Sequence, residues 1–224
     1  MKELIKVIDE WSEVWALFIP LAVIFTRKKA VKRMKLIVSY CFIALFLNVA
    51  AMFISQFHEL LPAYLQENLV LYNLHSLIRV VFLGWYILTS MYTGFNTRWR
   101  VLLFVYCLGV AANFIFLQSP FEFSTRLFAS ESVILLLFCL SYFYSAMQDE
   151  SETDWIKLPS FLVCIGISFF EAINFFIFLF FHPLAVKNEK FGRATWSIYN
   201  ITFVLLCICL ALAFKRNARV QQKN

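Results

Sequence analysis

The chain has 224 residues, of which 62% are hydrophobic and 15% charged, and its mean hydropathy is +0.74. A soluble domain is about half apolar and about a quarter charged, so this composition excludes an ordinary water-soluble fold and indicates lipid as the solvent. The net charge of +6 does not indicate nucleic acid as a partner, because the basic residues stand in short runs between apolar stretches, a pattern typical of membrane topology signals.

Apolar stretches long enough to cross a membrane recur seven times along the chain. A helix that spans a bilayer core takes about 20 predominantly apolar residues. Such stretches lie at residues 7–26, 36–57, 69–93, 101–118, 126–147, 155–181 and 191–214. The segments between them are short and polar, so we expect residues 1–224 to form a single all-α domain, a polytopic bundle of seven transmembrane helices.

The basic residues predict the orientation of this bundle. Most of the 20 Lys and Arg residues follow the first, third, fifth or seventh stretch, and such residues accumulate on the cytoplasmic side. We therefore expect the N-terminus outside and the C-terminus in the cytoplasm of a cell membrane, most simply a bacterial inner membrane. The first stretch lacks an A-x-A-like cleavage site and is followed at once by basic residues, so it is expected to remain as a helix.

The third stretch carries a polar stripe on an otherwise apolar helix. Asn68, Tyr72, His75, Arg79 and Tyr86 follow one another at helical spacing, which places them on one face. Ionisable groups inside a bilayer are costly and mark functional sites by default. We expect this face to point into the bundle.

The other polar residues lie at related depths. Arg79 and Glu171 each lie ten residues from the outer end of their stretch, about 15 Å deep at the rise of a helix, so we predict that they form a central ion pair. His75 and Glu131 would form a second, shallower couple. The full set of candidate ligand-binding residues is Glu13, His75, Arg79, Glu131, Glu171 and Asn174.

These residues concentrate in the outer half of the predicted bundle, and the inner half carries no charge. We expect them to line a polar, water-filled cavity that opens to the outside and is closed below by apolar packing. The plainer alternative is that they form interhelical hydrogen bonds with no ligand, worth roughly 0.6 kcal/mol each.

The sequence gives little support to a metal, retinal or catalytic site. The six cysteines lie inside apolar stretches without a CxxC spacing, the last stretch has no lysine that could hold retinal, and no GxSxG or Walker A motif occurs. We therefore assign no catalytic residue, no metal ligand and no cofactor. An external site in which His58 and His182, at outer ends of stretches, join His75, Glu131 or Glu13 stays open as the centre of a lipid-modifying metalloenzyme.

Short motifs in the last three stretches resemble a seven-helix membrane module of the Bacteroidota, found alone or in front of histidine-kinase domains. They are Ser130-Glu131-Ser132, Tyr142-Phe143-Tyr144, Pro159-Ser160-Phe161 with Gly166, the run from Glu171 to Phe176, and the run from Trp196 to Asn200. The resemblance covers roughly the C-terminal 90 residues. It implies a sensory or signal-relaying unit, which here would need a separate partner protein for its output.

The sequence leaves several functions open. The first is a sensor-like membrane protein that binds a small ligand or ion, and the excess of Glu over Arg among the candidates favours a cation. The expected partners are the lipid bilayer, this ligand and a cytoplasmic or membrane signalling protein. The alternatives are a transporter or channel for a small solute, which predicts polar lining through to the cytoplasmic side, the metalloenzyme, and a structural role.

Overall fold

The structure is a computed structural model of the chain, and it describes residues 11–27, 34–61, 67–91, 97–148, 155–185 and 189–223. In that part of the chain every regular element is helical. The long helices are α2 (Ser12–Thr26), α3 (Lys35–Gln56), α4 (Leu69–Thr89), α5 (Thr97–Ala112), α6 (Thr125–Gln148), α7 (Pro159–Ala185) and α8 (Glu189–Lys223). Three short elements join them: η2 (His58–Leu60), the π-helix η4 (Asn113–Leu117) and η5 (Trp155–Lys157).

Six of these helical segments are long and apolar enough to cross a membrane. They are Lys35–Gln56, Leu69–Thr89, Thr97–Leu117, Thr125–Gln148, Pro159–Leu179 and Ala194–Arg219. The prediction of an all-α, multi-pass membrane protein is therefore confirmed. The seventh crossing remains a prediction, because α2 has 15 residues and residues 7–10 of the first predicted stretch lie outside the described residues.

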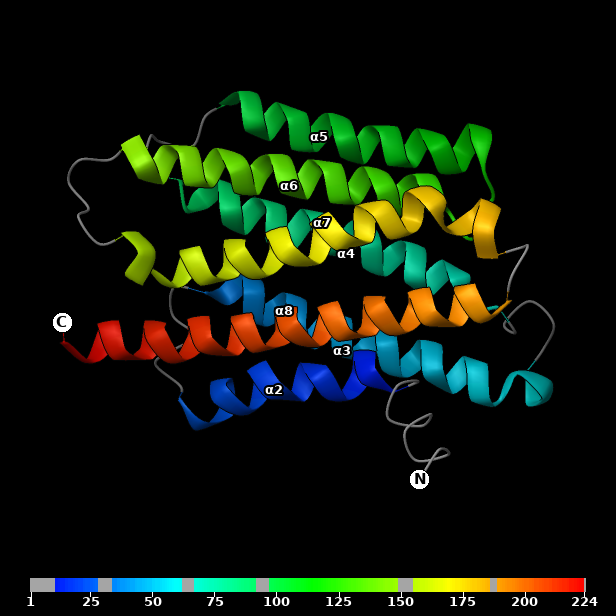
Figure 1. The fold of residues 1–224 in the computed structure, drawn as a ribbon, viewed down its shortest axis with the longest axis horizontal. Coiled ribbons are helices and arrows are strands. Elements are labelled where there is room, and N and C mark those ends of the chain that lie inside the picture. The colour runs from blue at the N-terminus through cyan, green and yellow to red at the C-terminus, as the bar shows by residue number, and fades with distance from the viewer. Residues whose placement is uncertain are drawn as a thin grey trace.

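Six helices close into a ring. The pairs α2–α3, α3–α4, α4–α6, α6–α7, α7–α8 and α8–α2 all pack against each other. The helices run roughly along one common axis, and α5 lies at the outer edge of the bundle (Figure 1), packed against α4. The C-terminus marks one end of the bundle, called here the C-terminal end.

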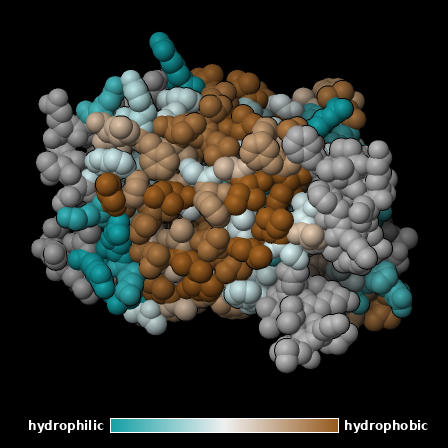
Figure 2. All heavy atoms as spheres, in the orientation of Figure 1, coloured by the Kyte–Doolittle hydropathy of each residue, from teal (hydrophilic) through white to brown (hydrophobic). Residues whose placement is uncertain are grey.

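The surface of the bundle suits a bilayer. Figure 2 shows a broad hydrophobic area across the middle of one face, with hydrophilic side chains toward the C-terminal end. Large apolar side chains point outward, among them Phe46, which is 72% exposed, and Phe104, which is 63% exposed. Water would make this arrangement unfavourable at about 25 cal/mol for each Å² exposed, and lipid removes that cost.

Helices α7 and α8 approach each other closely at a glycine. Gly166 of α7 faces α8 so closely that a Cβ at this position would lie 2.6 Å from the Cβ of Cys209. Small residues at helix interfaces let the backbones approach in this way in membranes. The α7–α8 pair therefore forms a tightly packed wall of the ring.

Candidate functional site

The six candidate residues are all buried inside the ring. Their exposed fractions are 6% for Glu13, 3% for His75, 2% for Arg79, 1% for Glu131 and Glu171, and 0% for Asn174. They come from α2, α4, α6 and α7. Together with the neighbours Tyr72, Ser76, Ser132 and Tyr199, they form what we call the polar centre.

Arg79 and Glu131 form the ion pair at the middle of the polar centre. Arg79 lies halfway along α4, and its Nε pairs with Glu131 Oε1 while its Nη2 donates to Glu131 Oε2 at 3.2 Å. Ser76, one turn before Arg79, donates its hydroxyl to the same Oε2. A bidentate guanidinium–carboxylate pair is among the strongest polar contacts, and it compensates for the cost of burying both charges in a membrane.

The remaining faces of Arg79 contact two further helices. Its Nη1 donates to the hydroxyl of Tyr199 on α8 at 3.5 Å. Its guanidinium carbon lies 4.9 Å from the ring centroid of Phe170 on α7, within the range of a cation–π interaction. One side chain on α4 thus joins α6, α7 and α8.

The direct partner of Arg79 differs from the predicted one. Glu171 was expected, but it accepts a hydrogen bond from Ser132 at 2.7 Å and acts on Arg79 only as a nearby charge. Equal depth says how far two residues lie from the membrane surface, and it does not say which helices are neighbours. Because α4 packs on α6, the carboxylate on α6 meets Arg79 first.

His75 also has a different neighbour from the one expected. Its Nε2 lies 3.5 Å from the hydroxyl of Tyr40 on α3, and the two rings stack with centroids 6.0 Å apart. His75 therefore joins α4 to α3 and does not pair with Glu131. Within the described ranges, no three His, Cys, Asp or Glu side chains come together as a metal-binding group, so the convergence that the metalloenzyme reading needs is not found there.

Glu13 enters the polar centre from the start of α2. Its carboxylate interacts with the hydroxyls of Tyr72 and Tyr199. Its backbone carbonyl accepts a hydrogen bond from the amide of Asn48 on α3 at 3.0 Å, which fixes the first turn of α2 against α3. The hydroxyl of Tyr199 thereby lies close to both Glu13 and Arg79.

Several polar atoms of the centre have no hydrogen-bond partner in the described part of the chain. They are Glu13 Oε1, Glu171 Oε1, and both Oδ1 and Nδ2 of Asn174. Most buried polar atoms in proteins bond to protein, ordered water or a ligand, so each exception calls for an explanation. Glu171 and Asn174 lie three residues apart on α7, which places them on one face of that helix.

Two pockets lie among the described residues of the bundle. One of the two described pockets is a groove between α5 and α6, and the other lies near Trp99 and Gln148 at the C-terminal end. None of the six candidate residues lines either of them. The open, water-filled cavity at the six candidate residues therefore stays a prediction.

An apolar layer separates the polar centre from the C-terminal end, as the sequence suggested. The buried side chains there include Leu21, Ile24, Ile37, Leu83, Ile87, Phe138, Val163, Leu206, Leu210 and Phe214. Nearer that end, Tyr142 and Ser160 share a hydrogen bond of 2.7 Å between α6 and α7. The buried groups are thus distributed unevenly, with the charges on one side and apolar packing on the other.

Three residues of the centre were not among the six candidates, although Ser132 and Tyr199 lie within the motifs that carry the resemblance. Tyr199 contacts Glu13 and Arg79, and Ser76 and Ser132 each donate to a buried carboxylate. Ser76 precedes Arg79 by one turn, and Ser132 is adjacent to Glu131, so both could have been found by asking which hydroxyls lie beside each buried charge. Tyr199 carried no such signal, because a tyrosine in an apolar helix is ordinary.

Comparisons of this chain with protein-family models, with curated proteins and with solved structures found no match.

Proposed function

We propose that this chain is a sensor-like membrane protein that binds a small cation in the polar centre and relays the binding through the packing of the ring. The observation that carries the proposal is an imbalance of charge. Glu13, Glu131 and Glu171 share one guanidinium, and the pairing of Arg79 with Glu131 leaves two buried carboxylates without an ion pair in the described residues. A small cation would balance part of this charge, which is costly in a membrane interior.

The unpartnered atoms are suitable ligands for such a cation. Glu13 Oε1, Glu171 Oε1 and Asn174 Oδ1 are carboxylate and amide oxygens, the type of ligand that hard cations prefer. They are contributed by α2 and α7, which both pack against α8. A cation held by Glu171 and Asn174, which share one face of α7, would favour one packing of α7 over another, which is the physical requirement for a binding event to be transmitted.

The distribution of buried groups supports sensing over transport. A conducting path needs polar lining on both sides of the binding site. Here the buried side chains toward the C-terminal end are mostly apolar, and Arg79 ties three neighbouring helices together. This favours a site that a cation occupies and leaves on the same side.

The C-terminal end offers a surface for a signalling partner. Helix α8 has 35 residues and is therefore about 52 Å long, against about 30 Å for a bilayer core. Arg216 on its last turns donates to the carbonyl of Ile156 in η5 at 2.8 Å, which couples α8 to the start of α7. The resemblance to the module that precedes histidine kinases favours the same end as the output.

The test is the thermal stability of the purified protein in detergent, at fixed pH, across a panel of sodium, potassium, magnesium and calcium salts. A ligand that binds only the folded state stabilises it by about 2.7 kcal/mol at a hundred times its Kd, so we expect one cation to raise Tm by several degrees in a saturable way. Glu171→Gln should abolish this rise.

Glu122→Gln is the matched control, because Glu122 is an exposed carboxylate outside the polar centre. It should keep the full response to the cation. Equal responses from both variants, or no specific response in the wild type, would argue for a centre that is only structural.

A further inference from the structure

A groove of about 290 Å³ lies between α5 and α6, and no residue of the polar centre lines it. One wall is formed by residues on one face of α5 and by the first residue of η4. The other wall is formed by the first two turns of α6. The lining residues are Tyr106, Gly109, Val110, Asn113, Arg126, Leu127 and Ser130.

The groove exists because α5 stands outside the ring. Helix α5 packs on α4, and the stretch Thr97–Leu117 buries only 11% of its most apolar window. Gly109 leaves the groove open, since a Cβ at this position would meet no atom within 4 Å. The α5 helix then widens into the π-helix η4 at Asn113, a distortion that often accompanies functional sites.

Helix α5 also carries apolar side chains outside the groove. The outward side chains on α5 are large and apolar, as Phe104 and Leu108 show with exposed fractions of 63% and 54%. Inside the groove, Val110 and Leu127 form a buried apolar wall. A molecule that enters from the membrane would therefore meet an apolar slot with a polar margin.

The polar margin carries an unpaired positive charge. Arg126 is the second residue of α6, it is exposed, and it forms no ion pair within the described ranges. Tyr106 adds a buried hydroxyl beside that of Ser130, which lies one turn beyond Arg126 in the same groove. An arginine, hydroxyl groups and a helix N-terminus together favour a phosphate group.

We propose that this groove binds a membrane phospholipid, with its phosphate at Arg126 and an acyl chain along Gly109 and Val110. The combination decides the class of ligand: a cation with hydroxyls recognises the phosphate, and the apolar slot open to the bilayer takes a hydrocarbon chain. A free phosphate would leave the apolar wall unused. The site is separate from the polar centre and does not depend on the function proposed for it.

The experiment is native mass spectrometry of the protein released from detergent in the presence of phosphatidylglycerol. Wild-type protein should retain one phosphatidylglycerol molecule above the background of weakly attached lipid. Arg126→Gln should reduce this bound fraction about tenfold by removing the charge. Gly109→Leu should do the same by filling the slot, and because a Cβ there would meet no atom within 4 Å, its Tm should stay close to that of the wild type.

Two controls make the result specific. Lys35→Gln removes an exposed positive charge outside the groove and should leave lipid retention unchanged. Added glycerol 3-phosphate should not displace the bound lipid, because it lacks the acyl chain. Retention that is equal in all variants would show adventitious surface lipid only, and displacement by glycerol 3-phosphate would show a headgroup site without an acyl slot; either result overturns the proposal.

Discussion

At the scale of single residues, Arg79 organises the polar centre. It pairs with Glu131, contacts Tyr199 and lies over the ring of Phe170. Removing one member of a buried ion pair leaves an uncompensated charge and costs about 3–5 kcal/mol. The contribution of Arg79 is therefore best measured together with its partners.

The first prediction is a double-mutant cycle for this pair. Arg79→Ala and Glu131→Ala should each lower the free energy of unfolding strongly, and the double variant should lose clearly less than the sum, with a coupling of about 1–3 kcal/mol. The measurement is denaturant unfolding in mixed micelles. The matched cycle with Glu171→Ala should show weaker coupling, because Glu171 bonds to Ser132 instead. A larger coupling of Arg79 with Glu171 than with Glu131 would contradict the Arg79–Glu131 ion pair.

Sequence reasoning found the residues of the centre more readily than their partners. The cost of charge in a membrane singles out Glu13, His75, Arg79, Glu131 and Glu171, and all of them are buried inside the ring. Arg79 pairs with Glu131 because α4 and α6 are neighbours. The depth of a residue in the membrane does not show which helices are neighbours. Buried hydroxyls such as that of Tyr199 escape the same argument, because they cost far less to place in an apolar helix.

At the scale of helices, the tight approach of α7 and α8 contrasts with the open groove beside α5. A Cβ at Gly166 would meet Cys209 at 2.6 Å, whereas one at Gly109 would meet nothing within 4 Å. The same substitution at the two glycines therefore tests how closely the helices pack.

We expect Gly166→Ala to lower the stability by about 1–3 kcal/mol, which is typical of overpacking. Gly109→Ala should leave it unchanged or raise it slightly, because alanine favours a helix more than glycine does. Thermal unfolding of the two variants measures the difference. Equal shifts would contradict the close approach of α7 and α8.

The predicted helices agree with the observed ones where hydrophobic length defines them. Residues 36–57 and 126–147 correspond to Lys35–Gln56 and Thr125–Gln148, since lipid requires an apolar stretch of this length. The position of α5 outside the ring could not be predicted, because its hydropathy of 2.1 matches the 2.2 of the deeply packed α7. In lipid, outward and inward faces are equally apolar, so hydropathy does not distinguish them. The π-helix at Asn113 had no signal in the sequence.

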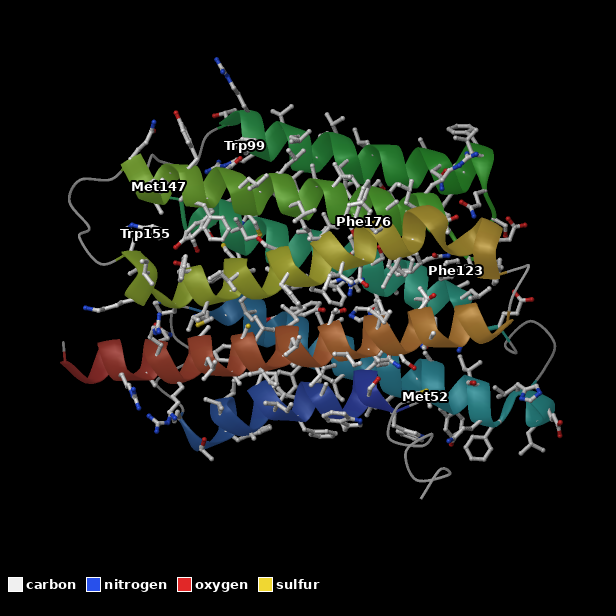
Figure 3. The ribbon with its side chains drawn as sticks, viewed as in Figure 1. Met52, Trp99, Phe123, Met147, Trp155 and Phe176 are labelled. Atoms are coloured by element: carbon white, nitrogen blue, oxygen red, sulfur yellow. The ribbon has the colours of Figure 1, made fainter. Side chains whose placement is uncertain are left out.

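At the scale of the whole molecule, the bundle has two chemically different ends. Basic side chains such as Arg98, Arg100 and Lys215 belong to the C-terminal end, while Glu59, Glu67 and Glu122 flank helix ends at the other. Trp99 and Trp155 also lie at the C-terminal end, and Phe123 lies toward the opposite one (Figure 3). Aromatic residues favour the interfaces of a membrane and basic residues its cytoplasmic side.

We therefore predict that the C-terminus is cytoplasmic. Green fluorescent protein fused after Asn224 should fluoresce in a bacterial host, because it folds in the cytoplasm, and alkaline phosphatase fused at the same place should be inactive. The opposite pair of results would reverse the orientation and would place the polar centre nearer the cytoplasm.

The central claim is that the polar centre holds a cation at Glu171 and Asn174 of α7. Titration calorimetry of the purified protein with the stabilising cation tests it most directly. We expect one saturable binding event in the wild type, its loss in Glu171→Gln, and its preservation in Glu122→Gln. Absence of binding heat for every cation at several temperatures, or unchanged affinity in Glu171→Gln, would contradict the account.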